Sequence, residues 1–314
     1  MIDSILLRIQ ASPPPKSALL KFRWQNARAY YRVGDNTYSP TLFYFAAADG
    51  KHYLSIEASL PKLIYGNNVQ MLNESQLKES LKQAGAFASE HFGVPFNASA
   101  AKVGRVDFCY NFSVGENRIY SYLQAASEAE PAHLKRRLIG KIETVEFFNK
   151  SRKIYCYDKS RETANLLKKG KATMETLERA RGILRLEARF SSTEAVKQLA
   201  FKQFGLTDYT AQSLLNFDIA KRVLTNAVEA LSLHEPVVSI DTRVDKLQEG
   251  YGYSSKLQRL AGFLRLCDIY GYQKMLALGV MKPSAFYKQR SEVRAAGALI
   301  FSSYHSTLPP LLVR

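Results

Sequence analysis

The seven residues 184–190, Leu-Arg-Leu-Glu-Ala-Arg-Phe, alternate strictly between apolar and charged side chains. Successive side chains of a β-strand point to opposite faces, so this period of two predicts a strand whose leucines and alanine face the core. Arg185, Glu187 and Arg189 then share the other face. The stretch predicts a sheet with one apolar face and one charged face.

Two further stretches repeat this pattern. Arg105 and Asp107 alternate with a valine and a phenylalanine, and Glu57 lies between an isoleucine and an alanine. If the three strands are neighbours, Glu57, Asp107 and Glu187 converge on one face, where a cation such as Mg²⁺ or Mn²⁺ would neutralise them. The alternative is a solvated face on which arginines and acids pair across strands. The pattern leaves both interpretations open.

The first two hundred residues consist mainly of strand-like stretches interrupted by single helical ones. Helical periodicity appears at 75–91, 117–129 and 192–204. This succession predicts an α+β fold with one antiparallel sheet and helices on one face. Besides 183–190, the predicted strands are 2–10, 19–33 (a hairpin), 38–47, 52–58, 102–113, 142–148 and 152–158.

The pattern changes after Gly205. From there the chain is predicted to be helical, so we expect two domains, residues 1–205 and residues 206–314. The predicted helices of the second domain are 213–232, 254–267, 272–278 and 283–296.

The chain is strongly basic. Its 314 residues include 44 Lys and Arg against 28 Asp and Glu, a net charge of +16, which favours a polyanionic partner such as nucleic acid. Basic residues are most concentrated in the C-terminal segment. There, the last two predicted helices are similar to a helix-turn-helix unit, and Lys288, Arg290 and Arg294 would contact DNA. The alternative is a basic helix pair that only packs on the first domain.

The three cysteines, Cys109, Cys156 and Cys267, are far apart in the sequence. They form neither a disulfide framework nor a metal-binding spacing, which favours buried thiols in a reducing compartment. The first residues lack a signal-peptide pattern, and no apolar run approaches the ~18 residues that cross a bilayer. We therefore expect a cytoplasmic protein without a membrane partner.

Residues 152–162 place Tyr155 and Tyr157 on one face of a predicted strand, among basic residues. A tyrosine hydroxyl is a poor nucleophile unless a metal or a nearby cation lowers its pKa from about 10. Beside a metal-bound phosphate, such a tyrosine could form a phosphotyrosyl bond. The alternative is a pair of amphipathic strand residues in a chain that has 18 tyrosines.

Taken together and in order, these segments resemble the replication initiator endonucleases of filamentous phages, the gene II/X protein family, and related rolling-circle proteins of phages and plasmids. Each motif is short, and the ordered succession carries the resemblance over nearly the whole chain. The segments are residues 1–3, 56–62, 66–69, 105–107, 144–146, 149–152, 157–162, 184–189 and 254–298.

The resemblance implies a DNA nickase with a ferredoxin-like antiparallel sheet. Its catalytic tyrosine would lie in a Tyr-x-Lys-x-x-Glu segment, here Tyr157, Lys159 and Glu162. Strand carboxylates of the kind found at Asp107 and Glu187 would hold the metal, and Glu57 is assigned to the same set. Relatives often have a histidine where this chain has an asparagine in the 66–69 segment.

We therefore predict a site-specific single-strand endonuclease that depends on Mg²⁺ or Mn²⁺ and starts rolling-circle replication in the cytoplasm of a bacterial host. Tyr157 would attack origin DNA, giving a 5′-phosphotyrosyl intermediate and a free 3′-hydroxyl for the host polymerase; a host helicase is a second expected partner. Lys159 would stabilise the phenolate or the phosphate. Tyr155 would stack beside the site or alternate with Tyr157.

Arg105, Arg185 and Arg189 would contact DNA from the same charged face. Two other functions fit part of the pattern. A non-catalytic DNA-binding regulator of replication would keep the fold without the chemistry. An RNA-binding module with surface aromatic residues fits the charge and leaves the strand carboxylates unexplained.

Overall fold

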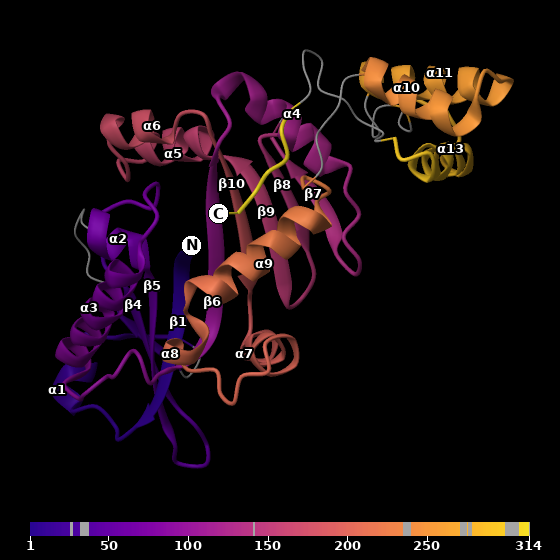
Figure 1. Cartoon of the computed structure of the whole chain (residues 1–314). Coiled ribbons are helices and arrows are strands. Elements are labelled where there is room, and N and C mark those ends of the chain that lie inside the picture. The colour runs from indigo at the N-terminus through magenta and orange to yellow at the C-terminus, as the bar shows by residue number, and fades with distance from the viewer. Residues whose placement is uncertain are drawn as a thin grey trace.

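The computed structural model describes residues 1–25, 28–31, 38–140, 142–234, 240–270, 275, 278–298 and 308–313. In this part of the chain ten strands form one antiparallel sheet in the order β2-β3-β4-β5-β1-β6-β10-β9-β8-β7 (Figure 1). The strands are β1 (Ile2–Ala11), β2 (Arg23–Gln25), β3 (Arg28–Tyr31), β4 (Thr41–Ala46), β5 (His52–Ser59), β6 (Lys102–Ser113), β7 (Lys135–Ile139), β8 (Thr144–Phe148), β9 (Arg152–Asp158) and β10 (Ile183–Phe190).

Helices connect the strands and follow them. Those of the first two-thirds of the chain are α1 (Lys16–Leu19), α2 (Leu60–Tyr65), α3 (Glu74–Phe92), α4 (Glu116–Ser127), α5 (Lys159–Lys168), α6 (Met174–Ala180), α7 (Thr193–Lys197) and the π-helical turn η1 (Gln198–Gln203). Then come α8 (Ala211–Leu214), α9 (Phe217–Ala230), α10 (Ile240–Tyr251), α11 (Ser255–Tyr270) and α13 (Pro283–Ala295).

Strand β10 lies in the middle of the sheet and confirms the alternation predicted for residues 184–190. It pairs with β6 on one side and with β9 on the other. Leu184, Leu186 and Ala188 are buried in the main core, while the three charged residues that alternate with them lie on the opposite face. An α+β fold with an antiparallel sheet is thus confirmed. The prediction that helices lie on one face is wrong, because Lys159 at the start of α5 lies on the charged face. The ferredoxin-like topology stays a prediction.

The apolar face of the sheet is covered by amphipathic helices. Helix α3 begins with a capping box in which Asn73 and Gln76 satisfy each other's backbone N–H groups, and it buries Leu77, Leu81 and Ala84. Helices α4 and α9 add their own apolar stripes to the same core. Within the described part of the chain, no helix combines the length and apolar character needed to cross a membrane.

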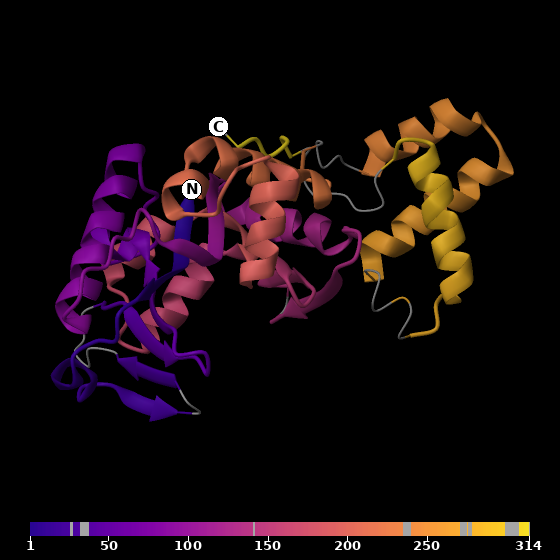
Figure 2. The ribbon, with the colours of Figure 1, turned by 90° about the horizontal axis from the view of Figure 1, so that it is seen from below.

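A second, smaller core is formed by α10, α11 and α13, around Leu260, Phe263 and Phe286. Figures 1 and 2 show these helices standing to one side of the sheet. We predicted the boundary after residue 205, but α8 and α9 bury their apolar residues against the sheet. The main core includes Leu233 and also three residues near the C-terminus, Leu308, Leu311 and Val313. The helical pattern at residues 213–232 therefore belongs to a helix that covers the sheet of the first unit.

Several short elements were not predicted. The sequence pattern does not indicate these elements because they are short or mostly polar. They are β7, α1, α2, α5, α6 and α10. The hairpin predicted at residues 19–33 is confirmed by the antiparallel pairing of β2 with β3, which are short strands. Most of the predicted helix at 272–278 lies outside the described residues, and the helix predicted at 283–296 is α13.

The two cores predict separate responses to mutation. Leu224 is fully buried on α9 and Leu264 is fully buried in the second core. Trp24, the single tryptophan, belongs to strand β2, so we expect its fluorescence to report unfolding of the unit that contains the sheet. We expect Leu224→Ala to lower the free energy of unfolding measured by this signal in urea by about 2–5 kcal/mol. Leu264→Ala should leave the urea midpoint of the tryptophan signal unchanged. Equal shifts of this midpoint in both variants would contradict the division into two separate cores.

Candidate active site

The charged face of β10 is the centre of a continuous polar surface that extends over β6 and β9. Cross-strand pairing places Arg189 opposite Asp107, and Glu187 opposite Tyr155. We call this surface the polar face. Its residues alternate with the core residues on the three strands, and Glu57 of β5 joins them; they include Arg105, Asp107, Tyr155, Tyr157, Arg185, Glu187 and Arg189. It contains two clusters: one is buried around Arg185, and the other is partly open around Asp107.

Arg185 is the most extensively bonded residue of the buried cluster. Its Nε donates to Glu187 Oε1 (2.8 Å) and one terminal nitrogen donates to Asp3 Oδ2 (2.6 Å). The other terminal nitrogen donates to the Asn68 carbonyl (2.6 Å) and to Asn111 Oδ1 (3.2 Å). Burial raises the pKa of Asp3, but the Arg185 guanidinium, the Lys159 ammonium and the hydrogen bonds from Ser59 and Asn68 together hold that pKa below its ordinary value. The carboxylates therefore compensate the buried cation.

Lys159 enters the same cluster from the first turn of α5. Asp158 caps that helix by accepting hydrogen bonds from the backbone N–H groups of Ser160 and Arg161, which turns the chain sharply at the end of β9. The Lys159 ammonium is fully buried and donates to Asn68 Oδ1 (3.0 Å) and Glu162 Oε2 (2.8 Å). Burial, and then the nearby arginine, lower its pKa.

Tyr157 lies over this cluster with only 9% of its surface exposed. Its hydroxyl donates to Glu187 Oε1 (2.7 Å), the oxygen that also accepts from Arg185. The Lys159 ammonium lies 5.9 Å from the centre of its ring. Burial, reinforced by the Glu187 carboxylate, raises the pKa of Tyr157 well above its ordinary value. In this arrangement Tyr157 is a protonated hydrogen-bond donor next to a carboxylate.

The second cluster is a chain of alternating charges. Glu57 accepts from Arg105 (3.0 Å), Arg105 lies 3.6 Å from Asp107, and Arg189 donates both Nε (2.9 Å) and a terminal nitrogen (2.7 Å) to Asp107. Asp107 is buried, whereas the Glu57 side chain is 39% exposed and Arg189 is 29% exposed. Despite both arginines, burial raises the pKa of Asp107 to about 6.

Tyr155 lies between the two clusters and is more accessible than Tyr157. The Arg189 guanidinium is 5.4 Å, and the Lys153 ammonium 5.9 Å, from the centre of its ring. Two cations thus flank its face. Its cross-strand neighbour is Glu187, so both tyrosines of the predicted pair adjoin the same carboxylate.

Comparison with models of known protein families identifies the family to which the chain belongs. A family model that describes the N-terminal part of a phage replication-associated protein matches residues 26–212. The chain belongs to this phage replication initiator family. The match contains β9, β10 and both tyrosines of the site. No curated protein and no solved structure matched the chain.

The predicted metal ligands of this initiator lie on one face but do not form a common site. Glu57 and Asp107 are joined through Arg105, and Glu187 is bonded to Arg185 and Tyr157. Among the described residues, no group of three His, Cys, Asp or Glu side chains is arranged to hold a metal ion. The present arrangement is the cross-strand ion pairing that the sequence left as an alternative, and the need for Mg²⁺ or Mn²⁺ stays a prediction.

The predicted DNA-binding residues of the initiator divide into exposed and buried ones. Lys288 and Arg294 are exposed on α13. Arg290 is 4% exposed and bonds Glu130 and the carbonyl of Glu128, which lie just after α4. Its side chain therefore fastens α13 to the sheet unit, as in the packing alternative for this helix pair.

Sequence reasoning also missed some members of the buried cluster. Asp3, Asn68 and Asn111 were assigned no role, although the first two lie in segments that carried the family resemblance. Asn68 contacts Asp3, Lys159 and Arg185 at once. Within the described part of the chain, Asn67, where relatives often have histidine, bonds Tyr65 at the end of α2 and Val69 of its own loop.

The bonding of Arg185 predicts that removing this one cation strongly lowers the stability of the fold. We expect Arg185→Met to lower the free energy of unfolding by about 3–5 kcal/mol, because Asp3 and Glu187 lose their buried partner. Arg179 makes an exposed ion pair with Glu175, so Arg179→Met should change stability by at most about 1 kcal/mol. Urea unfolding measures both, and similar small losses would contradict the buried network.

Asp107 predicts a pH-dependent difference in stability. Its carboxyl has a pKa of about 6 in the folded chain against an ordinary 3.8, so the folded state binds more protons between these values. The stability of the wild type relative to Asp107→Asn should therefore rise as pH falls from 7 towards 4, by up to about 1.4 kcal/mol per pH unit. Urea unfolding at pH 7, 6 and 5 measures the difference. A stability advantage of the wild type over Asp107→Asn that grows as pH rises would contradict this expectation.

Proposed function

We propose that this phage replication initiator is a DNA strand-nicking and strand-joining enzyme whose nucleophile is the Tyr157 hydroxyl. The observation that carries the proposal is the 2.7 Å hydrogen bond from this hydroxyl to Glu187. A nucleophile bonded to a carboxylate that is itself oriented by a third group, here Arg185, has the arrangement typical of activated hydroxyl nucleophiles. The role in phage replication comes from the family; the chemistry is our proposal.

The proposed reaction is a transesterification. The Tyr157 oxygen attacks the phosphorus of one phosphodiester and its proton passes to Glu187, which serves as general base. The bond from phosphorus to the 3′-oxygen breaks, and that oxygen takes up a proton to become a free 3′-hydroxyl. The strand's 5′-phosphate is then esterified to Tyr157. The reverse reaction with another 3′-hydroxyl rejoins the DNA.

Cations around Tyr157 favour this step. The Lys159 ammonium and the Arg185 guanidinium lie in the same buried cluster as the hydroxyl. In a site that excludes water, fixed positive charges stabilise the negative charge that develops on the phosphoryl oxygens. Lys159 is the better placed of the two for this role, because Arg185 is already bonded to two carboxylates.

Access to Tyr157 requires that its cover moves. The loop at Asn68 and the start of α5 are bonded to each other through Lys159, and they cover Arg185. Because the Tyr157 side chain is almost fully buried, a phosphodiester reaches its hydroxyl only when this cover opens. The raised pKa of Tyr157 keeps the nucleophile protonated while the site is closed.

The partly open cluster is the proposed contact for the DNA backbone beside the cleaved bond. Arg105 and Arg189 are partly exposed and lie along the same face. A DNA phosphate can replace Asp107 as a bidentate partner of Arg189. The proposed substrate is origin DNA, and the released 3′-hydroxyl suits extension by a host polymerase.

Tyr155 is the second candidate for the nucleophile. It is more exposed than Tyr157, and Arg189 and Lys153 flank its ring. Tyr157 is preferred because its hydroxyl has the carboxylate partner and because it lies in the Tyr-x-Lys-x-x-Glu segment.

Two single-atom substitutions separate these candidates. On a supercoiled plasmid carrying the phage origin, Tyr157→Phe should abolish nicking, because it removes the attacking oxygen and little else. Tyr155→Phe, the matched control two residues away, should retain measurable nicking. Conversion of supercoiled to open-circular DNA is measured on agarose gels.

Two outcomes would contradict this assignment. Nicking by Tyr157→Phe at the wild-type rate with loss in Tyr155→Phe would move the nucleophile to Tyr155. A wild-type chain that binds the origin without nicking it in the presence of Mg²⁺ or Mn²⁺ would instead favour a non-catalytic regulator of replication.

A further inference from the structure

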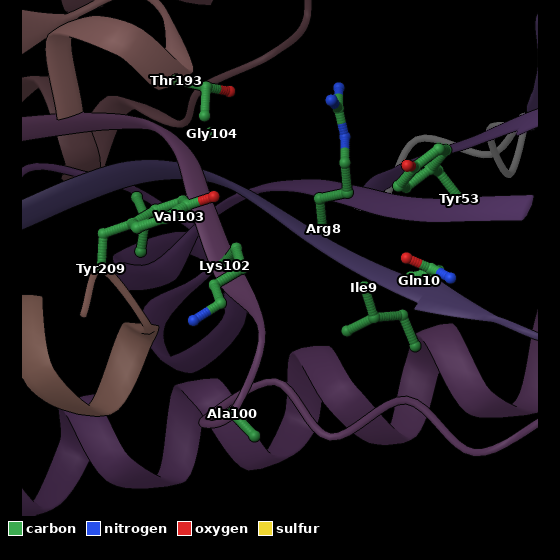
Figure 3. Close-up of a pocket in the computed structure, with 10 residues that line it drawn as sticks. All are labelled: Arg8, Ile9, Gln10, Tyr53, Ala100, Lys102, Val103, Gly104, Thr193 and Tyr209. Atoms are coloured by element: carbon green, nitrogen blue, oxygen red, sulfur yellow. The ribbon is translucent and has the colours of Figure 1, made fainter. Parts of the chain in front are cut away.

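A cavity of about 570 Å³ opens at the end of the polar face that is remote from Tyr157. The side chains that matter for its chemistry come from β1, β5, β6, the start of α7 and the segment before α8 (Figure 3). They are Arg8, Gln10, Tyr53, Lys102, Thr193 and Tyr209. No acidic side chain lines the cavity within the described part of the chain.

The cavity continues the track of charged residues that begins at Tyr157. Leu6 of β1 pairs with Glu57 on one side and with Arg105 on the other. Two residues further along β1, about 7 Å, Arg8 pairs with Lys102 of β6. Figure 3 shows the Arg8 side chain pointing away from its strand. A strand bound at the arginines of the open cluster can therefore extend into the cavity.

Tyr209 is held in place by backbone bonds. The N–H of Val103 donates to the Tyr209 carbonyl (2.9 Å), and Lys102 forms an antiparallel bridge with Thr210. Phe201 contacts the ring edge-on, with the ring centres 5.9 Å apart. The ring is thus pre-organised at the wall of the cavity, and a flat ligand would not have to order it.

Positive charge surrounds this ring. The ammonium groups of Lys102 and Lys197 lie 5.1 Å and 5.7 Å from its centre. The adjacent acid, Asp208, accepts hydrogen bonds from the backbone and the hydroxyl of Thr210, each 2.7 Å. The combination of an aromatic face with cations and a volume suited to a small ligand is typical of sites that bind unpaired nucleotides.

We infer that this cavity holds one unpaired base of a single DNA strand, stacked on Tyr209, with the neighbouring phosphates contacted by Arg8 and Lys102. In a duplex each base is covered by its neighbours on both faces, so only an unpaired base can stack on a tyrosine inside a cavity. The inference rests on the proposed function, because the bound strand is taken to be the one that is nicked. It adds a subsite that positions this strand at a distance from the reacting phosphate.

The test measures binding of a 5′-fluorescein-labelled (dT)₂₀ strand to the full chain by fluorescence anisotropy. Loss of one stacking ring should weaken binding of Tyr209→Ala by between about 5-fold and about 150-fold. Tyr209→Phe keeps the ring and should bind within about 2-fold of the wild type. Tyr120, exposed on α4, supplies the matched control, and Tyr120→Ala should bind as the wild type does.

A second variant tests the phosphate contact while the tyrosine itself stays in place. Lys102→Ala should reduce the slope of log affinity against log salt by about 0.7, the value for one phosphate contact to a single strand. Wild-type affinity for (dT)₂₀ in Tyr209→Ala, or an unchanged slope in Lys102→Ala, would overturn the inference. Displacement of the strand by an equal concentration of free dTMP would also overturn it, in favour of a free-nucleotide site.

The outcome is independent of the catalytic assignment. Tyr157→Phe should bind (dT)₂₀ as the wild type does, since its hydroxyl lies outside the cavity. If the wild type nicks origin DNA while Tyr209→Ala binds (dT)₂₀ normally, the subsite is wrong and the proposed function stands. If neither the wild type nor any variant nicks origin DNA, but Tyr209→Ala loses binding of (dT)₂₀, the proposed function is wrong and the base-binding cavity stands.

Discussion

The arrangement of the site depends on one buried cation. Arg185 projects from β10 into a space closed by the loop that follows α2 and by the start of α5, where water does not solvate it. Removing a guanidinium from water costs several kcal/mol, so the surrounding groups must supply partners for its donors. Asp3, Glu187 and two asparagines do so, and each thereby takes a fixed position. Glu187 is in this way oriented to accept the hydrogen bond from Tyr157.

The same constraint explains why charge alternates over the polar face. The carboxylates of Glu57, Asp107 and Glu187 are each bonded to an arginine, and the arginines of the open cluster each adjoin an acid. Such pairing keeps the face nearly neutral while leaving arginines at its exposed edge. A polyanion can exchange for the carboxylate at an exposed arginine, whereas it cannot do so at Arg185. The buried cluster therefore serves geometry, and the open cluster is suited to binding.

The local pattern of the sequence predicted which residues share a face, because a period of two depends only on the strand itself. It could not predict which partner each acid takes. That depends on register, since Asp107 meets Arg189 through the pairing of β6 with β10. It also could not predict Asn68, whose loop reaches the cluster from a distant part of the chain. Arg290 has the spacing of a DNA-binding residue, but tertiary packing turns it towards Glu130.

The central claim is that the Tyr157 oxygen becomes covalently bonded to DNA, and the most direct measurement identifies the bonded atom. After reaction with an origin strand, the protein–DNA adduct is digested with nuclease and trypsin and analysed by tandem mass spectrometry. Trypsin cuts after Lys153 and Lys159, so both tyrosines fall in one peptide, and fragment ions must separate them. The account predicts the nucleotide mass on Tyr157. The same mass on Tyr155, or on a residue outside this peptide, would contradict it.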